Sequence, residues 1–473
     1  MLLLILLHAF FVSFLDKPEK TVPQLSPRAI EQRAKWGIGT DEKDYPVSAL
    51  YTDSLRRLGA TIYHRSRWFN GVTCEMDSTL AQKVAGLKFV TGVELTRDNN
   101  RSSRFMPKRL RIPKCVSAEE SMKAADTDAQ LKLFNLLKLH ESGYAGQGIL
   151  MAVCDGGFRN ANTLSVFRQT QELGHFDFTD DTDGFYGSTG AHGTKCLSLI
   201  SGIETDFYGA ATQSDYYLMR SEENNTESRK EMDNLVAALE KADSLGVNVF
   251  SVSLGYAQFD DYRDLDKTKD LDGKATRCSR AATIAARKGM LVCVAAGNEG
   301  NNTWGTLSAP ADADSVLTVG AVDVNSKIGL FSSYGPSSDG RIKPEVCAVG
   351  VNAWVWSPSG SGTNDNGTSF ATPLLAGLAS SLWSALPDEN AMQIRERIIR
   401  SSTRYTSPDT NNYKYGYGIP DAWKAYTMEL PQGVDDVESQ EPKAKSQKIL
   451  RNGQLLIIRN GGTYSVTGGK IVN

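Results

Sequence analysis

The sequence predicts an α/β fold in which helices cover both faces of a parallel β-sheet. Short, continuous apolar runs alternate with helical segments between about residues 128 and 427 of the 473. Strands of a parallel sheet are buried on both faces, so they lack the alternation of polar and apolar residues seen in half-exposed strands. Function is expected at the carboxyl ends of such strands, where the sites of open α/β sheets gather.

Four apolar runs are expected to be strands of this sheet: 149–154, 247–254, 290–296 and 316–322. Helices are expected between them. One covers 277–288, and another carries the apolar stripe of Leu235, Leu239 and Leu245 and ends at Gly246. This order of elements predicts the parallel sheet.

The composition is typical of a soluble globular protein, with 40% hydrophobic and 23% charged residues. A net charge of −3 gives no basic footprint for nucleic acid or an anionic membrane. No apolar run reaches the roughly 18 residues that a membrane span needs, so no internal span is expected. The length predicts about two to four folding units.

The cysteines argue against a zinc ribbon or a dithiol redox site, because none stand in a CxxC pair. There are seven: Cys74, Cys115, Cys154, Cys196, Cys278, Cys293 and Cys347. Cys154, Cys293 and Cys347 lie in apolar runs and are expected to be small buried residues. No metal site is predicted.

The N-terminus, residues 1–19, is predicted to be a signal peptide. Leu2–Leu15 is almost wholly apolar, and Asp16 to Pro18 end the run. The run lacks a basic leading segment, and a buried N-terminal segment is the alternative. Export is expected, with the protein secreted, held at the cell surface or kept in the periplasm.

Residues 20–105 are predicted to form a small α+β domain. The pattern gives helix, strand, helix, strand, at 48–58, 61–75, 79–87 and 89–95. Residues 106–127 are then a linker. The basic stretch 97–111 is either simply solvated or a place where the chain is cut.

The C-terminal part is predicted to be a linker over 428–447 and a short β tail over 448–473. The linker is polar and charged, and the tail holds two short β runs with Asn-Gly turns. A small hairpin without a separate function is one interpretation of the tail.

Polar residues stand at the ends of the expected strands. Asp155 ends the run 149–154, and Asn298 follows the run 290–296. His192 stands in a Gly-flanked turn before an apolar helical stretch, 196–203. Taken singly, each is more often a capping or turn residue than a functional one.

Ser369 lies in the turn Asn366–Pro373, at the start of a long apolar helix whose first turn is expected to hold Pro373. Backbone N–H groups and the helix dipole there favour a developing oxyanion. The alternative is an N-cap before a core helix. An acid, an imidazole, an amide and a hydroxyl thus follow one another in the order Asp155, His192, Asn298, Ser369.

These blocks resemble the subtilase family of serine endopeptidases, peptidase family S8, over about Asp128–Tyr426. The matching motifs are Ala152–Gly157, His192–Thr194, Ser251–Gly255, Ala295–Asn298, Phe331–Pro336, Lys343–Val346 and Gly367–Pro373. The order acid, imidazole, serine is that of the subtilisin triad. Three positions depart from the family pattern: Gly156, Phe370 and Val349.

The resemblance implies a subtilisin-like fold and a serine endopeptidase acting on proteins or peptides. It assigns Ser369 as nucleophile, His192 as base and Asp155 as its partner, with Asn298 in the oxyanion hole. The substrate backbone would add as a strand along Ser253, Leu254 and Gly255. Ala295, Ala296 and Gly297 would line the neighbouring specificity pocket, for which we expect an apolar or aromatic side chain. No cofactor is required for catalysis, and structural calcium is left open.

The resemblance extends to the ends of the chain. Residues 20–105 resemble the inhibitory propeptide of bacterial exported members, which makes this domain a partner of the enzyme; a permanent accessory domain is the alternative. The tail resembles the sorting tails of secreted Bacteroidetes proteins.

A catalytically inactive subtilase fold that acts as a binding or adhesion module is the alternative function. An α/β-hydrolase esterase is disfavoured, since Ser369 lacks the G-x-S-x-G elbow.

Overall fold

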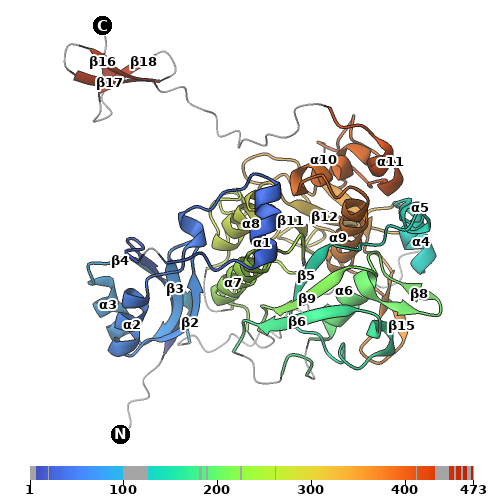
Figure 1. Ribbon diagram of the computed structural model, residues 1–473, viewed down its shortest axis with the longest axis horizontal. Coiled ribbons are helices and arrows are strands. Elements are labelled where there is room, and N and C mark those ends of the chain that lie inside the picture. The colour runs from blue at the N-terminus through green and yellow to red at the C-terminus, as the bar shows by residue number, and fades with distance from the viewer. Residues whose placement is uncertain are drawn as a thin grey trace. The chain divides into compact units, whose positions relative to one another are not determined.

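The computed structural model describes residues 7–19, 21–99, 126–180, 184–187, 190–223, 226–260, 263–411 and 413–431, and the backbone of strands between 447 and 471. The chain forms two compact units, Met1–Met428 and Glu429–Asn473 (Figure 1). The expected linkers fall largely outside the described residues.

A parallel sheet of seven strands lies at the centre of the first unit. Its order is β13 (Val346–Val349), β12 (Leu317–Val322), β11 (Leu291–Ala295), β10 (Val249–Val252), β5 (Leu150–Asp155), β9 (Asp215–Arg220) and β6 (Gln171–Asp177). The strands from β13 to β5 are buried along their whole length, whereas the edge strand β6 is largely exposed. The prediction of a parallel sheet with continuous apolar strands is confirmed.

Helices cover both faces of the sheet. One face packs against α4 (Thr127–Lys132), α5 (Leu136–Glu141), α6 (Ala191–Ser201), α9 (Thr368–Ala385), α10 (Ala391–Ser401) and α11 (Ala422–Thr427). The other packs against α7 (Arg229–Leu245) and α8 (Arg277–Arg287). Strand β5 has apolar side chains on both faces, which explains why both faces are covered. Met151 and Val153 belong to the first core, and Ala152 and Cys154 belong to the second. Two small hairpins, β7 (Ile203–Glu204) with β8 (Phe207–Tyr208) and β14 (Ala353–Trp356) with β15 (Gly362–Asp365), lie outside the sheet.

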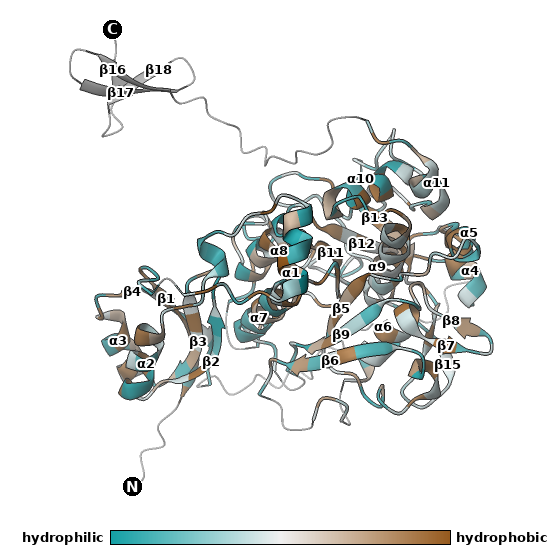
Figure 2. Cartoon of the chain, in the orientation of Figure 1, coloured by the Kyte–Doolittle hydropathy of each residue, from teal (hydrophilic) through white to brown (hydrophobic). Residues whose placement is uncertain are grey.

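The N-terminal domain is an antiparallel sheet in the order β2-β3-β1-β4 with two helices. Its elements are β1 (His8–Phe14), α2 (Ala49–Leu58), β2 (Thr61–Ser66), β3 (Gly71–Met76), α3 (Ser78–Ala85) and β4 (Val90–Arg97). The expected single strand 61–75 is instead a hairpin that turns at residues 67–70. Between β1 and α2, the hydrophilic helix α1 (Pro27–Lys35) packs against α7 (Figure 2).

The prediction of a signal peptide at 1–19 is wrong for the part that the structure describes. Residues 8–14 form β1, which pairs with both β3 and β4 inside the domain. Phe10, Val12 and Phe14 enter the domain's own core, and Phe11 on the opposite face lies under the Arg277 guanidinium of α8, 4.1 Å from it. A strand buried on both faces is continuously apolar, so its sequence resembles the core of a signal peptide.

The N-terminal domain binds α7 through a buried carboxylate. Glu240 accepts hydrogen bonds from the Ser66 hydroxyl at 2.5 Å and from the backbone N–H groups of Arg67 and Trp68 at 2.9 and 3.2 Å. The Trp68 side chain enters the core formed by α7 and α8. Arg67 also pairs with Asp243, at 2.6 Å. The two domains therefore share a hydrogen-bonded and apolar interface.

The second unit is a small antiparallel sheet of β16 (Gln447–Arg451), β17 (Gln454–Arg459), β18 (Gly462–Ser465) and β19 (Lys470–Ile471). The two β runs expected in the tail are β16 and β17. Among the described residues, no helix is both long and apolar enough to cross a membrane.

Candidate active site

Three neighbouring strands bring Asp155 and the segments that contain Ser253 and Asn298 to one edge of the sheet. Pairing sets Cys154 of β5 beside Val252 of β10, and Val252 beside Val294 of β11. The residues that follow, Asp155 and Ser253 among them, therefore emerge at the same level. The expectation that function gathers at the carboxyl ends of the strands agrees with this arrangement.

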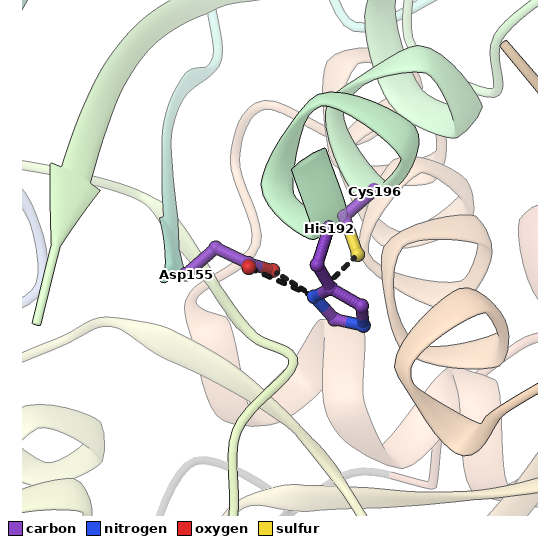
Figure 3. Close-up of side chains that lie close together, drawn as sticks. All are labelled: Asp155, His192 and Cys196. Carbon is purple, nitrogen blue, oxygen red and sulfur yellow. Dashed lines mark hydrogen bonds and ion pairs between the residues drawn. The ribbon is translucent and has the colours of Figure 1, made fainter. Parts of the chain in front are cut away.

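Asp155 and His192 are hydrogen-bonded (Figure 3). The Nδ1 atom of His192 lies 2.8 Å from Oδ1 and 3.0 Å from Oδ2 of Asp155. Asp155 is wholly buried, and its Oδ1 also accepts the N–H of Gly156 at 2.8 Å. With Nδ1 directed at the carboxylate, Nε2 is the nitrogen left to exchange a proton elsewhere.

Glycines allow the helix that carries His192 to approach Asp155. Gly190 caps α6 with φ +78°, a left-handed conformation that glycine adopts without strain. A Cβ at Gly193 would lie 2.3 Å from the Gly157 carbonyl oxygen and 2.9 Å from Cβ of Asp155. Any larger residue would push α6 away from the carboxylate.

The paired carboxylate changes the acidity of the imidazole. Burial alone would lower the pKa of His192, but the negative charge of Asp155, together with Cys196 and the hydrogen bonds of both residues, outweighs burial and raises the pKa well above 6.5. His192 retains some exposure, 23% of its side chain. The arrangement therefore holds a base that accepts protons readily and still reaches solvent.

Ser369 is the second residue of α9, and its backbone environment depends on Pro373. The proline lies beyond the first turn of α9, contrary to the sequence prediction, and has no N–H to bond the Ser369 carbonyl oxygen. That oxygen instead accepts from the Ser253 hydroxyl at 2.9 Å and the Cys196 thiol at 3.3 Å. These bonds join α9 to β10 and α6 around Ser369.

The Ser369 hydroxyl itself donates to the Ser253 carbonyl oxygen, at 3.2 Å. Among the described residues, no hydrogen bond joins it to His192. The two residues are nevertheless neighbours, because the ring of Phe370 lies 5.6 Å from the imidazole, centroid to centroid. Phe370, one of the departures from the family motif, packs against the imidazole.

Asn298 is held beside the start of α9. Its Oδ1 accepts from the N–H and the hydroxyl of Thr368, at 2.9 and 3.0 Å. The amide is thereby oriented with its NH2 group on the opposite side, as a donor. The preceding Gly297 has φ +110°, and a Cβ there would lie 2.9 Å from the Ser333 hydroxyl.

The expected substrate residues lie beside these groups. Ser253 to Gly255 follow β10, and Leu254 is 9% exposed. Ala295 and Ala296 are buried at the end of β11. Their expected contacts with substrate remain a prediction.

Sequence analysis did not assign a place in the site to Cys196. It stands four residues after His192 on α6, a spacing that places two side chains on one face of a helix. Its sulfur lies 3.8 Å from Nδ1 of His192. Among the described residues, Asp155, His192 and Cys196 are the group whose potential metal ligands all lie within 4.8 Å of one another.

Comparison with known proteins agrees with this geometry. The family model described as "Subtilase family" matches residues 146–418, and "Peptidase S8 propeptide domain, Bacteroidota" matches 9–109. Subtilisin DY of Bacillus licheniformis is 28% identical over 60% of this chain and 92% of its own length. Subtilisin BL of Lederbergia lenta is 26% identical over the same shares. The crystal structure of MycP1 without its N-terminal propeptide has a similar fold, with a TM-score of 0.52 at 23% identity, over 65% of this chain and 99% of its own.

The acidity of His192 can be measured directly. Its imidazole should titrate above 6.5 by NMR. Asp155→Asn should lower this pKa, because burial remains while the favourable charge is lost. His140, whose pKa burial lowers, is the internal control and should not change. An unchanged His192 pKa in the variant would contradict the pairing.

Proposed function

Because this chain belongs to the subtilase family of serine endopeptidases and has an S8 propeptide domain, we propose that Ser369, His192 and Asp155 are its catalytic triad. The hydrogen bond between Asp155 and Nδ1 of His192 is the observation that supports this most. It fixes the tautomer in which Nε2 accepts a proton, and the carboxylate stabilises the imidazolium that forms.

In the proposed reaction, Ser369 attacks the carbonyl carbon of a peptide bond. Its hydroxyl proton passes to Nε2 of His192, and the same proton later passes to the leaving amine. Attack requires the hydroxyl to turn from the Ser253 carbonyl oxygen towards the imidazole, a rotation about one side-chain bond. Catalytic hydrogen bonds are often long or misaligned before substrate binds.

We propose that the oxyanion is held by the NH2 group of Asn298 and the N–H of Ser369. The support is the pair of hydrogen bonds from Thr368 that orient the amide. The N–H of Ser369 lies in the first turn of α9, where backbone donors lack partners within the helix. Both donors would be fixed before charge develops, which is what makes such donors effective.

Substrate is proposed to add as a strand along Ser253, Leu254 and Gly255, with one side chain directed at Ala295–Gly297. The support is their position at the sheet edge that also carries Asp155. Side chains and backbone groups of the protein supply every proposed step, so none of these steps needs a cofactor.

The N-terminal domain is proposed to inhibit the enzyme until it is cut. Its last strand, β4, ends at Arg97, which pairs with Glu223 at 3.0 Å. Glu223 lies three residues after Arg220, the last residue of β9. Arg220 is opposite Asp155 in the backbone register of β9 with β5. The connector that follows Arg97 therefore starts near the carboxyl ends of β9 and β5, the side of the sheet on which Asp155 lies.

Export of the protein is likewise a proposal. Its support is the resemblance of the propeptide to those of exported bacterial subtilases, since residues 8–14 no longer support a signal peptide. A sorting role for the tail 448–473 is proposed on the tail's own resemblance to the sorting tails of secreted Bacteroidetes proteins.

The inactive binding module remains the second candidate, because the Ser369 hydroxyl is bonded to Ser253 and not to His192. The two functions differ in a simple measurement. Hydrolysis of casein by the purified protein supports the peptidase, and its absence at every pH after removal of the N-terminal domain supports the binding module.

Substitution tests the assigned roles. Ser369→Ala should abolish casein hydrolysis without changing the unfolding midpoint appreciably. Asn298→Ala should reduce turnover about 10²–10³-fold, the loss found for the corresponding donor of subtilisin itself. Asn325→Ala, at an exposed asparagine, is the matched control and should leave turnover unchanged. Wild-type rates in Ser369→Ala would refute the assignment.

Self-processing gives an independent test. The wild-type chain should be cut between Arg97 and Leu131, whereas Ser369→Ala should accumulate uncut, because the enzyme itself makes the first cut. Intact mass and N-terminal sequencing measure both. If both proteins kept residues 20–95 and the wild type were fully active, the N-terminal domain would be an accessory domain.

A further inference from the structure

The thiol of Cys196 is buried beside the paired Asp155 and His192, and the reaction proposed above does not use it. Three atoms of different chemistry meet there: a carboxylate oxygen, the imidazole Nδ1 and a thiol sulfur (Figure 3). The oxygen and the sulfur lie 2.8 and 3.8 Å from Nδ1. Each residue type is a common ligand of transition metals.

The spacing suits a tetrahedral cation. With Zn–N, Zn–O and Zn–S bonds of about 2.0–2.3 Å, ligand atoms of a tetrahedral site lie about 3.3–3.6 Å apart. The distances from Nδ1 to oxygen and to sulfur differ from these by about half an ångström or less. All candidate ligand atoms already lie within 4.8 Å of one another. A tetrahedral site also needs the Asp155 oxygen and the Cys196 sulfur about 3.6 Å apart. Cation binding therefore requires the carboxylate and the thiol to adjust together with the partly exposed imidazole.

The charges also balance. Asp155 and Cys196 are fully buried, so an unbalanced charge between them would be costly. A divalent cation is neutralised by one carboxylate and one thiolate, with the imidazole neutral. Thiolate and imidazole select zinc and cadmium over calcium and magnesium, which prefer oxygen ligands.

We propose that Asp155, His192 and Cys196 form an inhibitory site for a soft divalent cation of the Zn²⁺ type. This inference rests on the proposed triad for its effect on catalysis. The cation takes the place of the proton on Nδ1, and that proton is carried on Nε2 instead. The Cys196 thiol loses its proton to solvent, so one proton is released for each cation bound.

The consequence is loss of the base. An imidazole that binds a metal through Nδ1 and carries hydrogen on Nε2 is a donor at Nε2 and cannot accept the proton of Ser369. The Ser369 carbonyl oxygen loses the Cys196 donor but keeps the Ser253 hydroxyl. Inhibition would therefore act through proton transfer, with the helix α9 still anchored.

Binding is tested first without activity. Co²⁺ is added to the full-length Ser369→Ala protein, which cannot cut itself under the proposed function. One equivalent should give an absorption band of thiolate-to-cobalt charge transfer. The band should disappear in Cys196→Ser and persist in Cys278→Ser, a matched control at another buried helical cysteine. Cys196→Ala replaces the serine variant if that protein fails to fold.

Inhibition is tested second, in the active enzyme, with each variant compared with its own uninhibited rate. Zn²⁺ should inhibit the wild type and Cys278→Ser equally, and about tenfold or more Zn²⁺ should be needed for Cys196→Ser. Ca²⁺ at the same concentrations should not inhibit. EDTA should restore the rate.

The outcomes separate the two proposals. No cobalt–thiolate band, a band that survives both Cys196 variants, or equal zinc inhibition of wild type and Cys196→Ser would overturn the metal site. Failure of the triad alone would remove peptidase activity but leave the cobalt band, which still supports the site.

Discussion

The hydrogen bond between the buried carboxylate of Asp155 and Nδ1 of His192 is the interaction on which the rest of the site depends. A carboxylate that ends a fully buried strand is costly unless it is paired, and here the imidazole pairs with it. The pairing requires α6 to lie against the end of β5, which Gly193 permits by lacking a side chain. The same charge raises the pKa of His192, so one contact both stabilises the fold and prepares a base.

The missing N–H of Pro373 determines which groups bind the backbone around Ser369, the other half of the site. Because Pro373 leaves the Ser369 carbonyl oxygen without its helical hydrogen bond, the oxygen is bound by Ser253 and Cys196. These contacts join α9 to β10 and α6, which also carry the proposed substrate edge and the proposed base. Positions far apart in the chain are thus held together by one carbonyl group that has no hydrogen-bond donor within its own helix.

The catalytic part of the fold could be predicted because its buried strands and glycine turns leave local patterns in the sequence. The apolar run ending at Asp155 and the glycines around His192 are examples. Residues 8–14 were misassigned, since burial on both faces of β1 depends on a distant helix and produces the same apolar run as a signal peptide. Cys196 was overlooked for a related reason. Its sulfur lies near Asp155 and donates to the Ser369 carbonyl oxygen only because the fold brings these distant residues together. Its helical spacing from His192 was the one local indication.

The most direct test of the account is covalent labelling by a serine-directed fluorophosphonate, followed by peptide mapping. The probe needs a serine hydroxyl activated by a neighbouring base, so it reports the triad and not merely the fold. The account predicts one adduct, on Ser369, that is lost when Asp155 or His192 is replaced by alanine. An adduct on another serine, or none after the N-terminal domain has been removed, would contradict it.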